Sequence, residues 1–532
     1  MTILISPPLR LTFILAAILG SLLLGAQSIA ISAVGKAVLP STDTSQPDGV
    51  ETPTSEPLSD TNLTSTVPSN QCEGGGALRL LDVAWICDRS HQAVPMPESL
   101  RVLYVDNTNP NASDQNQGTA IRHPLKTLVH AAQIARPGDH LQVRAGGTYD
   151  DGPVELARSG TARHPIVLEA YPAEEWFSHS EPAEITGEGI ISRGNSHILI
   201  RGLNLANISG HGIRIEGPGV TDITILGNRT HKTCGSGISV WGVPWRADPG
   251  DYENMSDVIV ESNLLEFGTF GCRNEVITVA NGVRRASVRF NTIRFSDHDD
   301  MGDEGIDFKE GVTDSEIYGN LCYDLGDKCI YIDGGTAKWN NVASPYHNPV
   351  VTDIDIHSNR VIGGPSAGIA IATEGKGRVD SIRIYNNIVS GTARSGIRVH
   401  EHTDDSGTIA NISIIHNTVF NAKRNGIRLV RPDTTATIFG NIIWGSGDRS
   451  MIDVNQAPSV INICPESTCA IHSDPLLRVN DGSFVPEPGS PAIDSVSEGA
   501  VTRDFYGTKR PQGPRFDYGA VEVAAQDGVD RG

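Results

Sequence analysis

The sequence predicts an all-β solenoid in which each repeat is one coil of a parallel β-helix, and three observations support this. A segment of the form apolar-x-apolar-x-x-Asn recurs between residues 220 and 445. Its asparagines are spaced by 24 to 39 residues. A second short apolar strand recurs out of phase with the first, as in GISVW at 237 and GIRVH at 396. Repeats of roughly 20–50 residues with short strands indicate a solenoid or a propeller, and these units are too short for four-stranded propeller blades.

Stacked coils would bring the repeated asparagines into one internal column. Neighbouring coils lie about 4.8 Å apart, so the side-chain amides can hydrogen-bond up and down the stack at a tight turn. The predicted column consists of Asn228, Asn263, Asn291, Asn320, Asn359, Asn387, Asn417 and Asn441. The longer intervals, 229–262 and 321–358, are expected to form loops that project from one face.

The remaining segments give the expected domain organisation. Arg10, the apolar run that follows it and the small residues near position 30 predict a signal peptide over residues 1–33. Residues 34–71 are rich in Ser, Thr and Pro, which is typical of a disordered linker. Residues 72–139 are expected to form an N-terminal segment with a capping helix, ended by Pro137 and Gly138. The β-helix is expected over 140–472, with a C-terminal extension, 473–532, on or past its last coils.

Charge and cysteine content limit the partners and the compartment. The chain has 42 Lys and Arg against 63 Asp and Glu, a formal charge of −21, which argues against nucleic-acid binding. We expect a monomer with no membrane span after signal cleavage, secreted or at the cell surface. The eight cysteines predict disulfides, which occur mainly outside the cytosol. The expected pairs are Cys72–Cys87, Cys234–Cys272, Cys322–Cys329 and Cys464–Cys469.

The second strand of the repeat carries the candidate site. Alternate residues of a strand point away from the core, and these outward positions form two columns across the coils. The first column is Arg214, Ser239, Thr278, Asp307, Tyr331, Ala370, Arg398 and Arg428. The second is Glu216, Trp241, Ala280, Lys309, Asp333, Ala372, His400 and Val430. The middle coils therefore gather ionisable side chains on one sheet, next to the acidic stretch SDHDDMGDEG that ends at Gly305.

Residues 104–171 resemble the N-terminal cap and first coils of secreted right-handed parallel β-helix proteins of the pectate-lyase-like superfamily. The segments that carry the resemblance are YVDNTNPNASDQNQGTAIRHPLKTLVHAAQIARPGD, HLQVRAG and PIVLEAY. The C-terminal segments SDPLL, GSPAID and DYGAVE are also similar to the ends of such proteins. The resemblance covers roughly residues 100–522 and implies a right-handed β-helix. Some lyases of this fold hold calcium with Asp-Gly-x-x-x-Lys and Asp-Asp-x-x-Asp segments. DEGIDFK is similar to the first, and GDKCIYID stands in place of the second, with Tyr331 where an aspartate is expected.

The expected function is cleavage of an acidic, uronate-containing polysaccharide by β-elimination. This reaction needs the substrate carboxylate neutralised, a proton removed from C5 and the leaving oxygen protonated. Crowded carboxylates suit Ca²⁺, which takes about 6–8 oxygen ligands, and a lysine near such a cation can have a lowered pKa. The expected catalytic residues are Lys309, as base or substrate-positioning cation, with Arg398 and His400. The expected metal ligands are Asp303, Glu304, Asp307, Asp327 and Asp333, and the expected substrate-binding residues are Trp241, Tyr331, Glu374 and Arg428.

Three further functions fit the same residues. Asp307 and Asp333, about 8 Å apart by strand geometry, suit an inverting glycoside hydrolase. A C5-epimerase shares proton abstraction with the lyase. A carbohydrate-binding or adhesive β-helix would need neither a base nor a metal.

Overall fold

The computed structural model describes most of the chain from residue 99 onward. The described residues are 77–81, 84–88, 99–171, 183–242, 255–270, 272, 274–296, 304–335, 338–339, 342–343, 350–373, 377–401, 407–430, 434–453, 461–480, 482–497, 499 and 501–524. The expected signal peptide and linker lie outside them.

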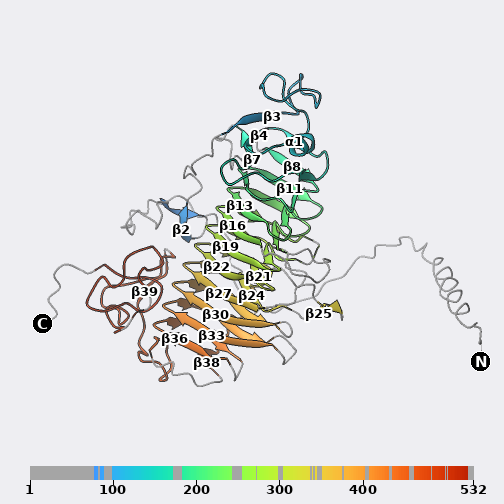
Figure 1. The fold of residues 1–532 in the computed structure, drawn as a ribbon. Coiled ribbons are helices and arrows are strands. Elements are labelled where there is room, and N and C mark those ends of the chain that lie inside the picture. The colour runs from blue at the N-terminus through green and yellow to red at the C-terminus, as the bar shows by residue number, and fades with distance from the viewer. Residues whose placement is uncertain are drawn as a thin grey trace, which may run out of the picture. The chain divides into compact units, whose positions relative to one another are not determined.

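Three long sheets of parallel strands run side by side along the chain, and each coil contributes one strand to each sheet (Figure 1). This confirms the predicted right-handed parallel β-helix. Sheet 1 contains β3 (Arg101–Val105), β4 (Asp139–Arg144), β7 (Ile166–Tyr171), β10 (Ile198–Arg201), β13 (Thr221–Leu226), β16 (Met255–Glu261), β19 (Val283–Arg289), β22 (Thr313–Tyr318), β27 (Val350–His357), β30 (Arg378–Tyr385), β33 (Thr408–Ile415) and β36 (Ala436–Phe439). Sheet 2 contains β5 (Thr148–Tyr149), β8 (Glu184–Gly187), β11 (Asn204–Ile208), β14 (Arg229–Thr233), β17 (Leu264–Glu266), β20 (Thr292–Arg294), β23 (Leu321–Tyr323), β28 (Arg360–Ile362), β31 (Ile388–Ser390), β34 (Thr418–Phe420) and β37 (Ile442–Trp444). Sheet 3 contains β6 (Val154–Leu156), β9 (Ile190–Arg193), β12 (Ile213–Glu216), β15 (Ile238–Trp241), β18 (Ile277–Ala280), β21 (Ile306–Lys309), β24 (Ile330–Asp333), β29 (Ile369–Thr373), β32 (Ser395–Glu401), β35 (Asn425–Leu429) and β38 (Arg449–Asp453).

The described part also holds three short antiparallel pairs. They are β1 (Ala77–Leu81) with β2 (Ala84–Asp88), β25 (Lys338–Trp339) with β26 (Val342–Ala343), and β39 (Leu477–Arg478) with β40 (Val485–Pro486).

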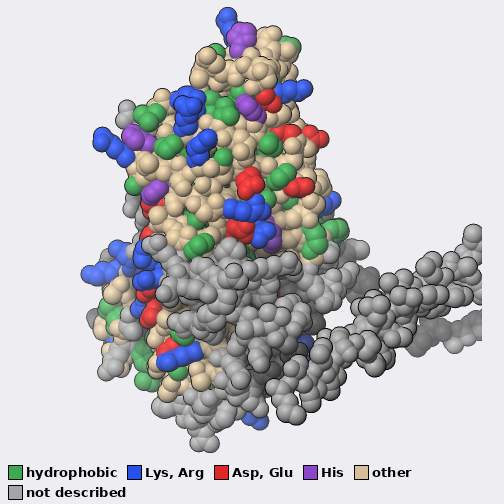
Figure 2. All heavy atoms as spheres, turned by 45° about the vertical axis from the view of Figure 1, so that its right-hand side comes forward, with side chains coloured by type: hydrophobic (Ala, Val, Ile, Leu, Met, Phe, Trp, Pro, Cys, Tyr) green, Lys and Arg blue, Asp and Glu red, His purple; other side chains and the backbone are tan. Residues whose placement is uncertain are grey.

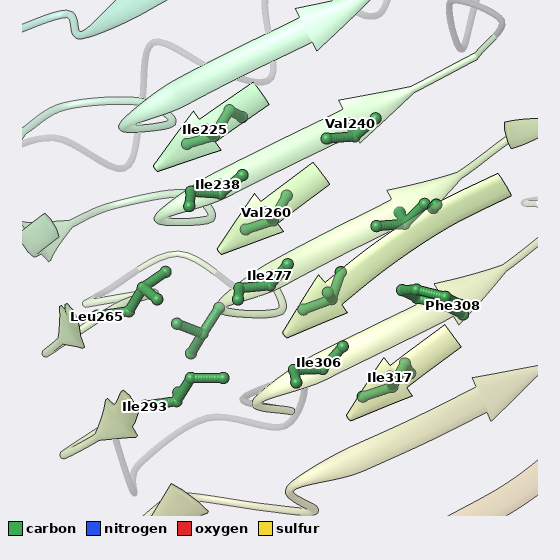
Figure 3. Packing of buried hydrophobic residues seen from close by; sticks show 14 of the residues in the cluster. Ile225, Ile238, Val240, Val260, Leu265, Ile277, Ile293, Ile306, Phe308 and Ile317 are labelled. Atoms are coloured by element: carbon green, nitrogen blue, oxygen red, sulfur yellow. The ribbon is translucent and has the colours of Figure 1, made fainter. Parts of the chain in front are cut away.

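The core is a stack of β-branched and leucine side chains, one layer per coil. Ile238, Ile277 and Ile306 lie in line in sheet 3 and face residues of the other two sheets, such as Val260 and Leu265 (Figure 3). All five are fully buried. Because the side chains of a strand alternate, these inward residues fix which neighbours point outward.

The asparagine column exists as predicted and is one member longer. Each asparagine donates its backbone N–H and its side-chain Nδ2 to the Oδ1 of the next, as Asn291 does to Asn320, with both distances 3.0 Å. Nδ2 also donates to a strand carbonyl of the preceding coil, as from Asn320 to Val288 at 2.9 Å. Asn462 continues the column beyond Asn441. Its spacing of 21 residues lies below the range that defined the repeat.

The N-terminal cap contains the expected helix, α1 (Leu128–Ile134). Thr127 begins it by accepting a hydrogen bond from the N–H of His130, and Leu128 is among the buried residues it turns toward the core. The first strand of sheet 1 is β3, which pairs with β4. The sheets therefore begin within the segment expected to be the cap.

Three of the four expected disulfides are present. They are Cys234–Cys272, Cys322–Cys329 and Cys464–Cys469, with Cα–Cα distances of 5.0, 5.8 and 5.7 Å. Cys234–Cys272 joins turns of successive coils, as the repeat register predicted. Cys72 lies outside the described residues, so its pairing with Cys87 stays a prediction.

The C-terminal extension packs on the outside of sheet 2. Phe484 and Phe505 form an apolar cluster with Ile388 of β31. The N–H of Ala520 donates to the Thr418 hydroxyl of β34 at 2.9 Å. The extension thus covers the last coils from the side.

Candidate active site

The outer face of sheet 3 has the predicted register. Asp307 pairs with Tyr331 and Lys309 with Asp333 between β21 and β24, and Ala372 pairs with His400 between β29 and β32. The two outward columns therefore run along the solenoid as counted from the sequence. A third column lies two residues before each strand, and its consecutive members are His211, Ser236, Glu275, Glu304 and Lys328.

This face is much less exposed than the sequence suggested. Outward positions were expected to meet solvent, yet Asp307, Asp333 and His400 are all buried. Tyr331 is buried as well, because it packs on Ala370, Ala372 and Ala367. The small side chains at 370 and 372 leave room for the tyrosine, so these side chains form a packed layer and not a solvated surface.

Lys309 lies between two carboxylates. Its Nζ is 2.5 Å from Glu275 Oε1 and 3.0 Å from Asp307 Oδ2. Glu275 Oε2 also accepts the Thr278 hydroxyl at 2.8 Å, and Thr278 is 2.9 Å from the Ser236 hydroxyl. A buried polar network therefore fixes the lysine from two sides.

The charges of this cluster correct the role expected of Lys309. Burial favours the neutral amine, but the attraction of Asp307 and Glu275 outweighs it and raises the Lys309 pKa well above its usual value. The expected lowering, toward a catalytic base, is wrong for this arrangement. Burial, opposed by Lys309 and reinforced by Glu275 and Asp333, raises the pKa of Asp307 well above its usual range. Asp307 Oδ1 is buried without a hydrogen-bond partner among the described residues.

A second lysine organises the neighbouring coil. Lys328 Nζ is 2.9 Å from Glu304 Oε1 and 2.6 Å from Asp327 Oδ2, and it lies 4.5 Å from the centroid of the Tyr331 ring. Burial raises the pKa of Glu304, although Lys328 opposes this. Lys328 also fixes one face of the tyrosine through a cation–π contact.

Sequence reasoning missed Glu275 and Lys328. Both lie in turns, where no apolar repeat marks a residue. Their positions two residues before successive strands, in line with Glu304, were the signal that could have found them.

Two coils beyond Tyr331, the outward residues in the same column of sheet 3 are arginines. Arg398 and Arg428 pair in register between β32 and β35. Burial lowers the pKa of Arg398, and the positive charges of Arg428 and Arg394 lower it further, while Tyr331 and Asp327 oppose the shift. The Nε atoms of Arg398 and Arg428 are buried and have no hydrogen-bond partner in the described part of the chain. Such donors favour an anionic ligand.

The carboxylates expected to hold calcium do not converge. Glu304 and Asp327 both bind Lys328, and Asp307 binds Lys309. Asp333 Oδ1 accepts the N–H of Gly335 at 2.8 Å. Within the described ranges, no three His, Cys, Asp or Glu side chains come together as a metal site requires. These residues do not fit Ca²⁺, because lysine cations already hold three of the carboxylates.

Three other predicted residues remain to be placed. Asp303 and Glu374 lie outside the described residues. Trp241 is half-buried at the end of β15, two coils before Lys309 in the same column. It is therefore on the expected face but not among the ion pairs.

Comparison with solved structures supports the fold. The crystal structure of pectate lyase Pel9A is similar with a TM-score of 0.50 at 14% identity, over 80% of this chain and 97% of that one. The likeness is one of fold. The chain is a right-handed parallel β-helix. A complex of XylC with xylose (TM-score 0.48, 11% identity, 79% and 98% covered) and the adhesin PfbA of Streptococcus pneumoniae (0.37, 13%, 61% and 86%) are more distant. No family model and no curated protein matches the sequence.

The disulfides indicate the compartment in which the protein acts. The three disulfides of the described part are compatible with a secreted protein. No helix in that part is long and apolar enough to cross a membrane.

Proposed function

We propose that the outer face of sheet 3 binds an acidic polysaccharide outside the cell and cleaves it by β-elimination. The arginine pair Arg398–Arg428 is the observation that carries this proposal. Two adjacent guanidinium groups with buried, unpaired Nε atoms suit a sugar carboxylate, because guanidinium matches carboxylate geometry in a bidentate manner. Within the described residues, no Asp or Glu forms a salt bridge with either arginine.

The neighbouring side chains have the chemistry that elimination needs. Arg398 and Arg428 would neutralise the uronate carboxylate, which makes the C5 proton easier to remove. His400, two residues beyond Arg398 on the same strand, would accept the C5 proton. The Tyr331 hydroxyl would protonate the leaving oxygen. Tyr331 and His400 come from strands two coils apart and lie two residues apart along the strand, so their backbones are separated by roughly 12 Å.

Lys309 has a supporting role in this scheme. It keeps its proton, so it would offset the charge of Glu275 and Asp307 beside the bound polyanion. Without that cation the buried carboxylates would repel an acidic substrate. We therefore assign Lys309 as a positioning cation, the second of its two expected roles.

A screen of uronate polysaccharides tests the reaction. Polygalacturonate and alginate would be incubated with the full chain, with and without chelator, and unsaturated ends followed by ultraviolet absorbance. We expect cleavage that falls about 100-fold or more in Arg398→Lys and His400→Gln, since each removes a transition-state contact. Arg424→Ala, an exposed arginine of the same region, is the matched control. A polymer cleaved equally well by His400→Gln would refute the assigned base. Chelator should leave the rate unchanged, because lysines already hold Asp307, Glu304 and Asp327.

Hydrolysis is the second candidate, and one observation favours it. Burial, opposed by Lys309 and reinforced by Glu275 and Asp333, raises the pKa of Asp307, which is the direction that a general acid needs. Asp333, one coil away and two residues along the strand, is placed to act as the base. Asp307→Asn would abolish hydrolysis but leave elimination by His400 and Tyr331 largely intact. Reducing ends without new ultraviolet absorbance would indicate hydrolysis.

The same screen distinguishes an epimerase and a non-catalytic binder from a lyase. An epimerase would change the uronate composition without shortening the chain. A non-catalytic binder would retain polysaccharide without any product. We further propose that the protein acts as a monomer, which light scattering would test.

A further inference from the structure

One turn position holds a bulky residue in three successive coils of the solenoid. The fourth residue counted from the start of each sheet 2 strand has a positive φ in nine successive coils, from β11 to β37. These residues are Asn207, Lys232, Phe267, Phe295, Asp324, Gly363, Gly391, Asn421 and Gly445. Glycine, asparagine and aspartate tolerate this conformation. Lys232, Phe267 and Phe295, with φ of 55°, 50° and 57°, are unfavourable there. Retained strain of this kind points to a function.

The phenylalanines form part of an aromatic row along the solenoid. The Phe267 ring lies 5.2 Å from that of His231 in the coil before and 5.4 Å from that of Phe295 in the coil after, measured between centroids. Phe267 is 36% exposed, and Phe270, three residues on, is 58% exposed. Large exposed apolar side chains grouped together are typical of binding sites.

The turn that carries both rings is held in place. Cys272 is joined to Cys234 of the preceding coil, and the Phe270 N–H donates to the Thr233 carbonyl at 2.9 Å. Because the turn is rigid, less conformational entropy is lost when a ligand binds to the two rings.

The same turn leads directly to the candidate active site. It starts at Phe267 and ends at Glu275, the partner of Lys309. Around the row, Arg229 and Arg294 share the single carboxylate of Glu266, at 2.7 and 2.6 Å. Arg294 also lies over the Phe295 ring, 5.2 Å from its centroid, so guanidinium groups that suit an acidic chain lie beside the row. Figure 2 shows charges of both signs interspersed over the face that it draws.

We propose that Phe267 and Phe270 form an aromatic carbohydrate subsite, which binds the apolar face of a sugar in the same acidic polysaccharide. This inference rests on the function proposed above. The rings supply the apolar contact, and the flanking arginines supply attraction for the sugar acid. The subsite lies four coils, about 19 Å, before Arg398 and His400 along the solenoid, so it would govern affinity and not the chemical step.

Equilibrium binding of polygalacturonate and alginate oligosaccharides tests the subsite. The full chain would carry His400→Gln, so that the ligand is not consumed. We expect the dissociation constant to rise about tenfold in Phe267→Asn and in Phe270→Ser, the loss typical of one aromatic contact. Leu476→Ala, an exposed apolar residue of the C-terminal extension, is the matched control and should leave binding unchanged.

The melting temperature distinguishes a binding role of Phe267 from a structural role. Phe267→Asn places a residue that tolerates positive φ in the strained position, so its melting temperature should equal or exceed that of the parent. A variant that stays folded and changes the dissociation constant by less than about twofold would overturn the subsite while leaving the proposed function intact. If the parent binds no uronate chain but binds neutral xylan through Phe267 and Phe270, the acidic substrate is wrong and the aromatic subsite stands. Xylan binding that is independent of both rings, or no binding at all, would refute both.

Discussion

Asn320 illustrates how a single residue serves three coils. Its Nδ2 donates to the Val288 carbonyl and to Asn359 Oδ1, while its own Oδ1 accepts the N–H and the Nδ2 of Asn291. All of these groups are buried. A buried donor or acceptor that loses its partner costs about 1–3 kcal/mol, so each position of the column affects the coil before and the coil after.

We predict that Asn320→Leu lowers the free energy of unfolding by about 2–4 kcal/mol, because it orphans two donors of Asn291 and the Val288 carbonyl. Urea unfolding followed by circular dichroism measures this. Asn111→Ala, at an exposed position, is the control. A loss similar to that of the control would mean that water replaces the missing amide.

Glu275 sets the protonation of Lys309. The pKa of Lys309 is raised in the fold, so this pair stabilises the protein below the unfolded lysine value of 10.5, and the stabilisation is lost as the pH rises through the higher folded value. We expect Glu275→Gln to move alkaline unfolding to lower pH. Circular dichroism at rising pH checks this, with Glu316→Gln on sheet 1 as control. An unchanged midpoint would show that Asp307 alone holds the lysine.

These residues also show what the sequence could reveal. The asparagine spacing fixed the register, so the pairing of Lys309 with Asp333 across strands could be counted without coordinates. The ion-pair partner of a side chain could not be predicted from the strand register. Lys309 turns to Glu275, which lies in a turn whose path depends on tertiary packing. The direction of the Lys309 pKa was mispredicted for that reason.

At the scale of elements, a buried cluster of one arginine and three carboxylates stabilises the C-terminal extension. Arg510 donates to the carbonyls of Asp517 and Gly519 at 3.1 and 2.7 Å and lies 3.5 Å from Glu522 Oε2. Asp504 accepts the N–H groups of Thr508 and Glu522. Asp517 and Glu522 begin and end the C-terminal segment DYGAVE. One arginine faces three carboxylates here.

That imbalance makes docking of the extension depend on pH. Burial raises the pKa of Asp504 to about 6 and, with the charge of Glu522, raises that of Asp517 to about 7. The folded state therefore binds more protons than the unfolded state between about pH 4 and 7. Stability is greatest below this window and falls as the pH rises through it. We expect hydrogen exchange of residues 501–524 to accelerate from pH 5 to pH 8, after correction for intrinsic rates.

Asp517→Asn provides the matched comparison. It removes the upper titration while keeping a side chain of the same shape, so exchange should depend less on pH between 6 and 8. A variant with the pH dependence of the parent would assign the effect to other groups.

The disulfide Cys234–Cys272 connects successive turns beside the candidate site. It closes a loop of 38 residues, and a crosslink of this size contributes about 2–4 kcal/mol. We expect the double variant Cys234→Ser, Cys272→Ser to lose about that much stability in thermal unfolding. Activity should fall as well, because the turn between the cysteines leads to Glu275. Full activity with lowered stability would mean that the coil stack alone positions the turn.

Over the whole molecule, net charge and local charge act in opposite directions. The chain carries a formal charge of −21, yet the proposed substrate is a polyanion. Long-range repulsion slows its approach, while Arg398 and Arg428 attract it only at short range. Salt screens over about 10 Å at 0.1 M, which suppresses the distant charges more than the contacts at the site.

We therefore predict that kcat/KM on a long uronate polymer rises as NaCl is increased from about 0.01 to 0.1 M, and that it falls only at higher salt, when the arginine contacts are screened too. A short oligosaccharide of the same sugar carries fewer charges, so its rate should change less. Steady-state kinetics on both substrates at several salt concentrations measures the two effects. A rate on the polymer that falls steadily from the lowest salt would show that the local arginine field dominates at every distance, and the acidic balance of the chain would then play no part in substrate selection.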